Sequence, residues 1–361
     1  MRKFLLTLFL ALSVSTSAFA SWTNYDYTPV NMAAAIDDAL FDDFAEIFPT
    51  SDADVFEIQY RTGVTREDTA GDIYNLTYTR STDTYGSRTL LFECPDSALD
   101  ATNPTSGRIG DTLYTLINCK DTGNTDSIDY LYSRAVSGAI NSWTLVTTYD
   151  PANTANGWGR LVATSDSNTY WYPISQNAPG VPITQFKTTD GGATWAVGST
   201  MVASPSYWSE ATCAYVPGTG HICIVRNDNG DYVNQIVSTD GLGTTWTAPA
   251  DTNLGAATGV KLSTLFYDST SGSLVLIFTD RSDTTMYASV TKPYKAFQGV
   301  WETPRSISSG VSNEATVYEV DTASRIFLLM TGVASGTGGG RLNDFTYRNL
   351  QQYLKFGQIG P

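Results

Sequence analysis

A repeat of about fifty residues is the feature that most constrains how this chain can fold. Three stretches share one pattern, in which a tyrosine is followed by a turn containing Gly or Ser and then by alternating apolar residues. They begin at Tyr215, Tyr267 and Tyr318, so the tyrosines are 52 and 51 residues apart. Alternation places apolar side chains on one face of a strand, so each stretch predicts a β-hairpin. A unit of this length with several short strands is typical of a β-propeller.

A second motif recurs with the same period and predicts a tight turn. Residues 188–195 (TTDGGATW) fit Ser/Thr-x-Asp-x-Gly-x-Thr-Trp at every fixed position, and residues 238–246 (STDGLGTTW) fit it with one inserted residue. Weaker copies begin at Ser81, Ser133 and Ser289, so the five starts are separated by 52, 55, 50 and 51 residues. The Asp can cap backbone N–H groups, the Gly can adopt a positive φ, and the Trp can pack beneath the turn. We therefore expect this motif to stabilise a turn between strands and not to form a reactive centre.

These motifs resemble the Asp boxes (BNR repeats) of the sialidase, or neuraminidase, superfamily, whose members are six-bladed β-propellers. The 309 residues from about residue 53 to the end of the sequence divide into nearly six units of 52 residues. The expected fold is therefore an all-β, six-bladed propeller over residues 53–361. Asp boxes also occur in propellers without glycosidase activity, so the resemblance bears on the fold more than on the function.

Two segments are expected before the propeller. Residues 1–20 have the basic start, the apolar stretch and the small-x-small ending of a secretory signal peptide, and an uncleaved membrane anchor is the alternative. Residues 21–52 form a separate N-terminal segment that contains a short amphipathic helix over residues 29–48. The apolar stripe that predicts this helix consists of Ala33, Ile36, Leu40, Phe44 and Ile47. Export predicts a protein that is secreted or held at a cell or virion surface.

The four cysteines are expected to form disulfides, since export leads to an oxidising compartment. Cys213 and Cys223 flank a turn, which predicts that they lie on adjacent antiparallel strands. Cys94 and Cys119 each end an apolar, strand-like run, and we expect them to form the second pair. The CxxC spacing of zinc sites is absent.

Charge and composition exclude several classes of function. The formal net charge is −15, which argues against binding to nucleic acid or to an anionic membrane. The only histidine is His221, so a Ser-His-Asp triad or a site with several histidine ligands is not expected. No cofactor is expected either. The polar run at residues 227–231 could hold Ca²⁺ through oxygen ligands, although a solvated turn is the alternative.

The resemblance to sialidases implies a set of site residues. In that family three arginines from different blades hold the carboxylate of the sugar, a Glu activates a Tyr nucleophile, and an Asp is the acid/base. Residues 209–227 resemble the central hairpin of the family, with Glu210 at its start and Arg226 at its end. Both residues are therefore expected at the same end of one blade, although they could also be ordinary rim residues.

The remaining members of the set are assigned by their position in the repeat. Arg281 follows the equivalent hairpin of the next blade, where the family has its third arginine, but it could instead pair with a neighbouring aspartate. Arg61 ends an opening strand, as the first arginine does, although the Arg-Ile-Pro motif is not reproduced. Asp68 is the expected acid/base, with Asp72 as the second candidate.

The nucleophile is where the sequence departs from the family. No Tyr stands in residues 311–315, the corresponding stretch, and Tyr318 matches the structural tyrosines of the repeat. Tyr207 could substitute, hydrolysis could proceed without a Tyr, or catalysis could have been lost. Five further aromatic residues could either stack on sugars or pack between blades: Trp158, Tyr170, Trp171, Tyr172 and Trp208.

The sequence therefore predicts an exported, sialidase-like glycoside hydrolase that acts on sialic-acid-type or other acidic glycans. The alternative is a non-catalytic glycan-binding propeller, such as an adhesin or a receptor-binding protein. A scaffold that binds protein is a third possibility. In all three cases the protein is expected to be exported before it acts.

Overall fold

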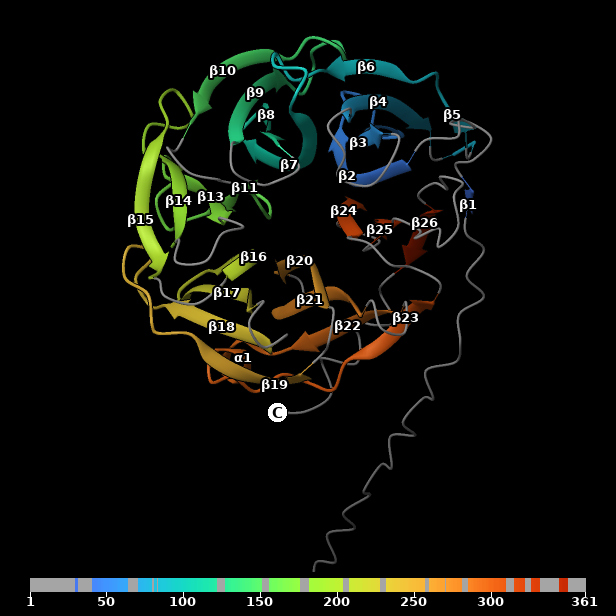
Figure 1. The fold of residues 1–361 in the computed structure, drawn as a ribbon. Helices are drawn as coiled ribbons and strands as arrows, with labels where there is room; N and C mark the ends of the chain where they lie inside the picture. Colours follow the sequence, from blue (N-terminus) through green and yellow to red (C-terminus); the bar gives the residue numbers. More distant parts are fainter. Residues whose placement is uncertain are drawn as a thin grey trace, which may run out of the picture.

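The computed structural model is all-β, and its sheets are arranged around a ring as in a β-propeller (Figure 1). In each sheet one edge strand lies toward the centre of the ring and the other lies at its outer rim. The described residues are 30–31, 41–63, 71–79, 81–82, 84–121, 127–150, 156–175, 182–203, 208–227, 232–256, 260–269, 271–280, 285–309, 315–321, 326–331 and 344–349.

Five blades are described with most of their side chains, and all their strand pairs are antiparallel. The first blade consists of β2 (Phe41–Pro49), β3 (Val55–Gly63), β4 (Asp72–Thr79), β5 (Thr84–Tyr85) and β6 (Thr89–Phe92). The second consists of β7 (Asp100–Ile109), β8 (Thr112–Lys120), β9 (Ser127–Ala135) and β10 (Thr144–Tyr149). The third consists of β11 (Asn156–Gly157), β12 (Val162–Ala163), β13 (Tyr170–Ser175), β14 (Ile183–Thr188) and β15 (Ala196–Val202).

The fourth and fifth blades repeat the same in-to-out order. The fourth consists of β16 (Trp208–Val216), β17 (Gly220–Asn227), β18 (Tyr232–Ser238) and β19 (Ala250–Ala256). The fifth consists of β20 (Val260–Asp268), β21 (Ser273–Asp280), β22 (Thr285–Thr291) and β23 (Arg305–Ser309). The short helix α1 (Pro293–Ala296) lies between β22 and β23.

A further four-stranded sheet is described by its backbone pairing alone. It joins β1 (Val30–Asn31) to β24 (Ala315–Asp321), β25 (Ile326–Thr331) and β26 (Asp344–Asn349), in the order β1-β26-β25-β24. Five blades are thus described with their side chains, where the sequence predicts six complete ones. The predicted hairpins are confirmed, because Tyr215, Tyr267 and Tyr318 each pair across to the following strand.

The hydrophobic core lies between neighbouring blades. β21 illustrates the reason, since its run SLVLIFTD is buried at every position except the last. A strand that is covered on both faces needs a continuous apolar run, not an alternating one. Separate buried clusters fill the spaces between consecutive blades, from the first and second to the fourth and fifth.

Both predicted disulfides are confirmed. Cys213 and Cys223 lie directly opposite each other on β16 and β17, with their Cα atoms 4.1 Å apart. Cys94, just after β6, is bonded to Cys119 on β8, with a Cα separation of 5.9 Å. The second bond therefore joins the outer part of the first blade to the second blade.

The two best-preserved Asp motifs form the turns that the sequence predicts. The Oδ1 atom of Asp190 accepts a hydrogen bond of 2.8 Å from the N–H of Thr194, and Asp240 accepts bonds from the N–H groups of Thr244 and Thr245. The hydroxyl and the N–H of Thr194 and the hydroxyl of Thr188 all donate hydrogen bonds to Asp190. These bonds favour its ionised form and lower its pKa to about 2. Trp195 packs against aromatic rings of the second and third blades, so it fills the space between them.

The predicted N-terminal helix is wrong over residues 30–31, which form strand β1, and over residues 41–48, which belong to strand β2. β2 pairs with β3, and a register shift lies between Asp43 and Glu46, where β2 has an extra residue. Such a bulge breaks the alternation of a strand, so the spacing between Phe44 and Ile47 imitates the period of a helix. The first blade thus begins before the predicted boundary at residue 53.

Other predictions at the N-terminus lie outside the described residues, including the signal peptide at residues 1–20. Within the described ranges, no helix is long and apolar enough to cross a membrane.

Candidate functional site

Glu210 and Arg226 meet at one end of the fourth blade, as the hairpin pattern predicts. Glu210 is near the start of β16, and a register shift between Trp208 and Ala211 gives this strand one extra residue at that point. Arg226 Nη1 donates a hydrogen bond of 2.7 Å to Glu210 Oε1. The glutamate side chain is 3% exposed and the arginine side chain 17% exposed, so only the arginine has appreciable contact with solvent.

Lys261 joins this pair from the next blade, and the sequence analysis missed it. Its Nζ atom lies 3.0 Å from Glu210 Oε1, and the N–H of Leu262 donates a 2.9 Å hydrogen bond to Glu210 Oε2. Leu262 stands 52 residues after Glu210, the length of the repeat. The repeat therefore places β20 beside Glu210, but it gives no reason to single out a lysine there. We call Glu210, Arg226 and Lys261 the Glu210 group.

Trp158 borders the Glu210 group from the third blade. The Nζ atom of Lys261 lies 4.5 Å from the centre of the indole ring, within cation–π distance. The backbone holds the tryptophan in place, since its N–H donates to the carbonyl of Pro173 at 3.1 Å. The next residue, Gly159, has φ +83°, and a Cβ there would lie 2.5 Å from the carbonyl oxygen of Ala211. Only glycine fits this close approach to β16 without strain.

Arg61 lies in a different ion pair, between the first and second blades. Its Nε and Nη2 atoms donate to the Asp100 carboxylate at 3.1 and 2.9 Å, and both side chains are essentially fully buried. Asp72, the second acid/base candidate, starts the neighbouring strand β4. Burial raises the pKa of Asp72, the charge of Glu93 raises it further, and Arg61 opposes the shift.

A third polar contact links strands near the ring centre. Glu46 of β2 accepts a 2.6 Å hydrogen bond from Ser106 of β7, and Arg160, which precedes β12, lies 3.3 Å from the same oxygen. The contact joins three blades, so it braces the inner wall of the ring. The sequence analysis did not identify it, because the three residues are far apart in the chain.

Several predicted residues lie outside the described part of the chain: Asp68, Arg281, Tyr207 and residues 228–231 of the polar run that could hold Ca²⁺. Among the residues that the structure does describe, no group of three or more His, Cys, Asp or Glu side chains could hold a metal ion. Trp171 and Tyr172 are fully buried in the clusters between blades, so they serve packing.

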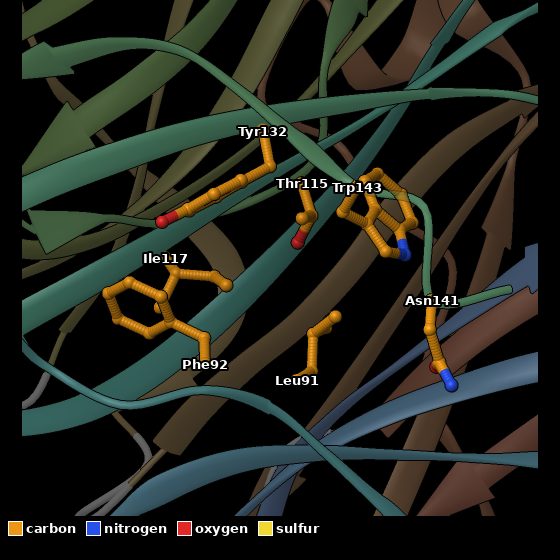
Figure 2. Close-up of a pocket in the computed structure, with 7 residues that line it drawn as sticks. All are labelled: Leu91, Phe92, Thr115, Ile117, Tyr132, Asn141 and Trp143. Atoms are coloured by element: carbon orange, nitrogen blue, oxygen red, sulfur yellow. The ribbon is translucent and has the colours of Figure 1, made fainter.

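A hollow lies between the first and second blades, away from the Glu210 group (Figure 2). Its walls combine aromatic and aliphatic side chains with polar groups, and Figure 2 shows these side chains around a common space. They are Leu91, Phe92, Thr115, Ile117, Tyr132, Asn141 and Trp143. None of the residues predicted for the site contributes to this hollow.

No family model and no curated protein matches the sequence. Among solved structures, a Hadza microbial sialidase superposes with a TM-score of 0.66 at 14% identity, over 90% of this chain and 69% of that one. The Trypanosoma rangeli sialidase in complex with sialic acid gives 0.63 at 15% identity, over 87% and 55%. An α-L-arabinofuranosidase of Fusarium graminearum gives 0.57 at 11% identity, over 90% and 97%. The chain has the fold of a sialidase-like β-propeller.

Proposed function

We propose that this chain is a sialidase-like glycoside hydrolase that acts on sialic-acid-type glycans at the Glu210 group. The observation that carries the proposal is the buried carboxylate of Glu210, held by Arg226 at 2.7 Å and Lys261 at 3.0 Å. It lies in a fold shared with sialidases and an arabinofuranosidase, all of which are glycoside hydrolases by name. At 9–15% identity the fold alone does not transfer a substrate, so the site chemistry has to supply it.

The chemistry of the Glu210 group suits an acidic sugar. Both oxygens of Glu210 accept hydrogen bonds or ion pairs, which fixes the carboxylate as an acceptor. Arg226 keeps part of its side chain exposed and can donate further hydrogen bonds to a ligand carboxylate. In this proposal Arg226 binds the carboxylate of the sugar, and Glu210 is one of the two catalytic carboxylates.

The proposal retains the other residues that the sialidase resemblance implies. Asp68 is the acid/base and Arg281 is a second contact for the sugar carboxylate. Arg61 is a third contact only if it exchanges its buried partner Asp100 for the sugar. The sheet formed by β1 and β24–β26 is the sixth blade of the ring. Residues 1–20 direct export, so that the protein meets its glycans outside the cell or at its surface.

A non-catalytic glycan-binding propeller is the second candidate. The observation in its favour is that Arg61 is 0% exposed and committed to Asp100, so it is not poised to hold a sugar carboxylate. The absence of a Tyr from residues 311–315 points the same way. Binding through Arg226 alone would satisfy this candidate.

A fluorogenic sialoside assay separates the two candidates. If the chain is a hydrolase, Glu210→Gln and Arg226→Ala each lose at least about a hundredfold in kcat/KM, because each removes a charged group from the site. Thermal unfolding of both variants controls for folding. If the wild type gives no turnover yet binds sialosides through Arg226, the result supports the non-catalytic glycan-binding propeller. If it does neither, both candidates are rejected.

A further inference from the structure

Trp158 is linked to Glu210 through a single ammonium group. Lys261 Nζ lies 3.0 Å from Glu210 Oε1 and 4.5 Å from the centre of the Trp158 ring. The Lys261 side chain is only 6% exposed, so the charge is shielded from water and the cation–π contact is correspondingly strong. Trp158 is half-buried, so part of its surface stays accessible to solvent.

The backbone that carries this indole is held in place by contacts within the protein. The backbone N–H of Trp158 donates a hydrogen bond to the carbonyl of Pro173. The next residue, Gly159, lets the backbone lie close to strand β16. A rigid aromatic ring provides apolar contact area without a large cost in side-chain entropy. The C–H face of a pyranose ring is the part of a sugar that such a surface fits.

A second Glu–cation–Trp arrangement in the same molecule provides a comparison. Arg134 pairs with Glu57 at 2.6 Å and lies 5.1 Å from the centre of the Trp143 ring, between the first and second blades. There the glutamate and the arginine are 0% exposed, and Trp143 Nε1 donates to Glu57 Oε1 at 2.9 Å. This arrangement is a blade-to-blade contact, so it is a matched structural control for the one at Trp158.

We propose that Trp158 is an aromatic platform for a sugar ring in the Glu210 site and that Lys261 is its positioning residue. The inference rests on the proposed function, because it takes the ligand to be a glycan bound at Glu210. Trp158 supplies the apolar contact, and Arg226 supplies the charged one. Lys261 keeps the indole and the carboxylate at a fixed separation.

Calorimetric titration with the methyl α-glycoside of N-acetylneuraminic acid tests the platform. Trp158→Ala weakens binding by at least about tenfold, while Trp158→Phe, which keeps an aromatic ring, loses no more than about threefold. Trp143→Phe leaves the dissociation constant unchanged although it lowers the melting temperature. If the wild type binds the glycoside and Trp158→Ala binds it equally well, the platform is rejected and the proposed function stands. If the wild type does not bind it, both are rejected.

The positioning role of Lys261 has a readout that needs no ligand. The difference in acrylamide quenching between wild type and Trp158→Phe isolates the fluorescence of this indole. Lys261→Met should make the indole more accessible to the quencher and weaken glycoside binding, and Lys261→Arg should restore both values. Equal quenching in Lys261→Met and wild type would show that the lysine does not hold the ring.

Discussion

Arg61 and Asp100 form a fully buried ion pair that joins the first blade to the second, with two guanidinium nitrogens on one carboxylate. Removing one partner of such a pair leaves an uncompensated charge in the protein interior. Asp100→Ala should therefore lower the free energy of unfolding by about 3–5 kcal/mol, measured by chemical denaturation. The double variant Arg61→Met/Asp100→Leu should recover most of that loss. If Asp100→Ala unfolds like the wild type, the pair contributes nothing to the interface.

Asp129 should make the stability fall as the pH rises from about 4 to about 7. Burial raises its pKa to about 7, against the opposing hydrogen bonds from Asn118 and Gly157. Between the unfolded value of about 4 and this folded value, the native state holds a proton that the unfolded state releases. The free energy of unfolding should thus decrease from about pH 4 to pH 7 and level off above it. Asp129→Asn should flatten this slope in denaturation curves at several pH values.

Asp240, in contrast, should make the stability fall as the solution becomes acidic. Burial alone raises its pKa, but hydrogen bonds from Thr244, Thr245 and Ser238 outweigh it and lower the pKa to about 2. The stabilisation is complete above the unfolded pKa of about 4 and is lost as the pH falls through about 2. Asp240→Ala should lower the melting temperature by a few degrees at pH 7 and much less at pH 2. An equal loss at both pH values would contradict the role of the charge.

The two disulfides should differ in their contribution to stability. Cys94–Cys119 closes a separation of 25 residues and joins two blades, whereas Cys213–Cys223 closes only 10 residues within one hairpin. In the chain-entropy model a longer loop gives more stabilisation. Replacing Cys94 and Cys119 by Ser should cost about 3–4 kcal/mol of unfolding free energy, and the second pair should cost less. The reverse order in denaturation experiments would contradict this.

Much of the fold could be predicted from the sequence, because the repeat is local in each unit. The hairpins at Tyr215 and Tyr267 and the turns at Asp190 and Asp240 depend on residues that are neighbours in the chain. The strand at residues 41–49 was missed because its bulge disguises the alternation of its side chains. Local period alone cannot separate such a strand from a short helix.

The candidate site could be predicted only in part. Glu210 and Arg226 belong to one hairpin, so their meeting followed from its geometry. Lys261 and Asp100 come from neighbouring blades, and the pattern of a single unit does not show which side chains face each other across that boundary. A comparison of equivalent positions in successive units would have placed β20 next to Glu210.

The pairing of β1 with β26 has a consequence for how the molecule is made. Val30 lies opposite Phe345, so two segments that are far apart in the chain share one hydrogen-bonded ladder. Pairing over such a separation carries a large loop-closure cost and forms slowly. On the ribosome the preceding sheets can assemble one after another, but the last joint has to wait until synthesis has passed residue 349. A nascent chain would therefore leave this seam exposed to chaperones until residues 344–349 have emerged.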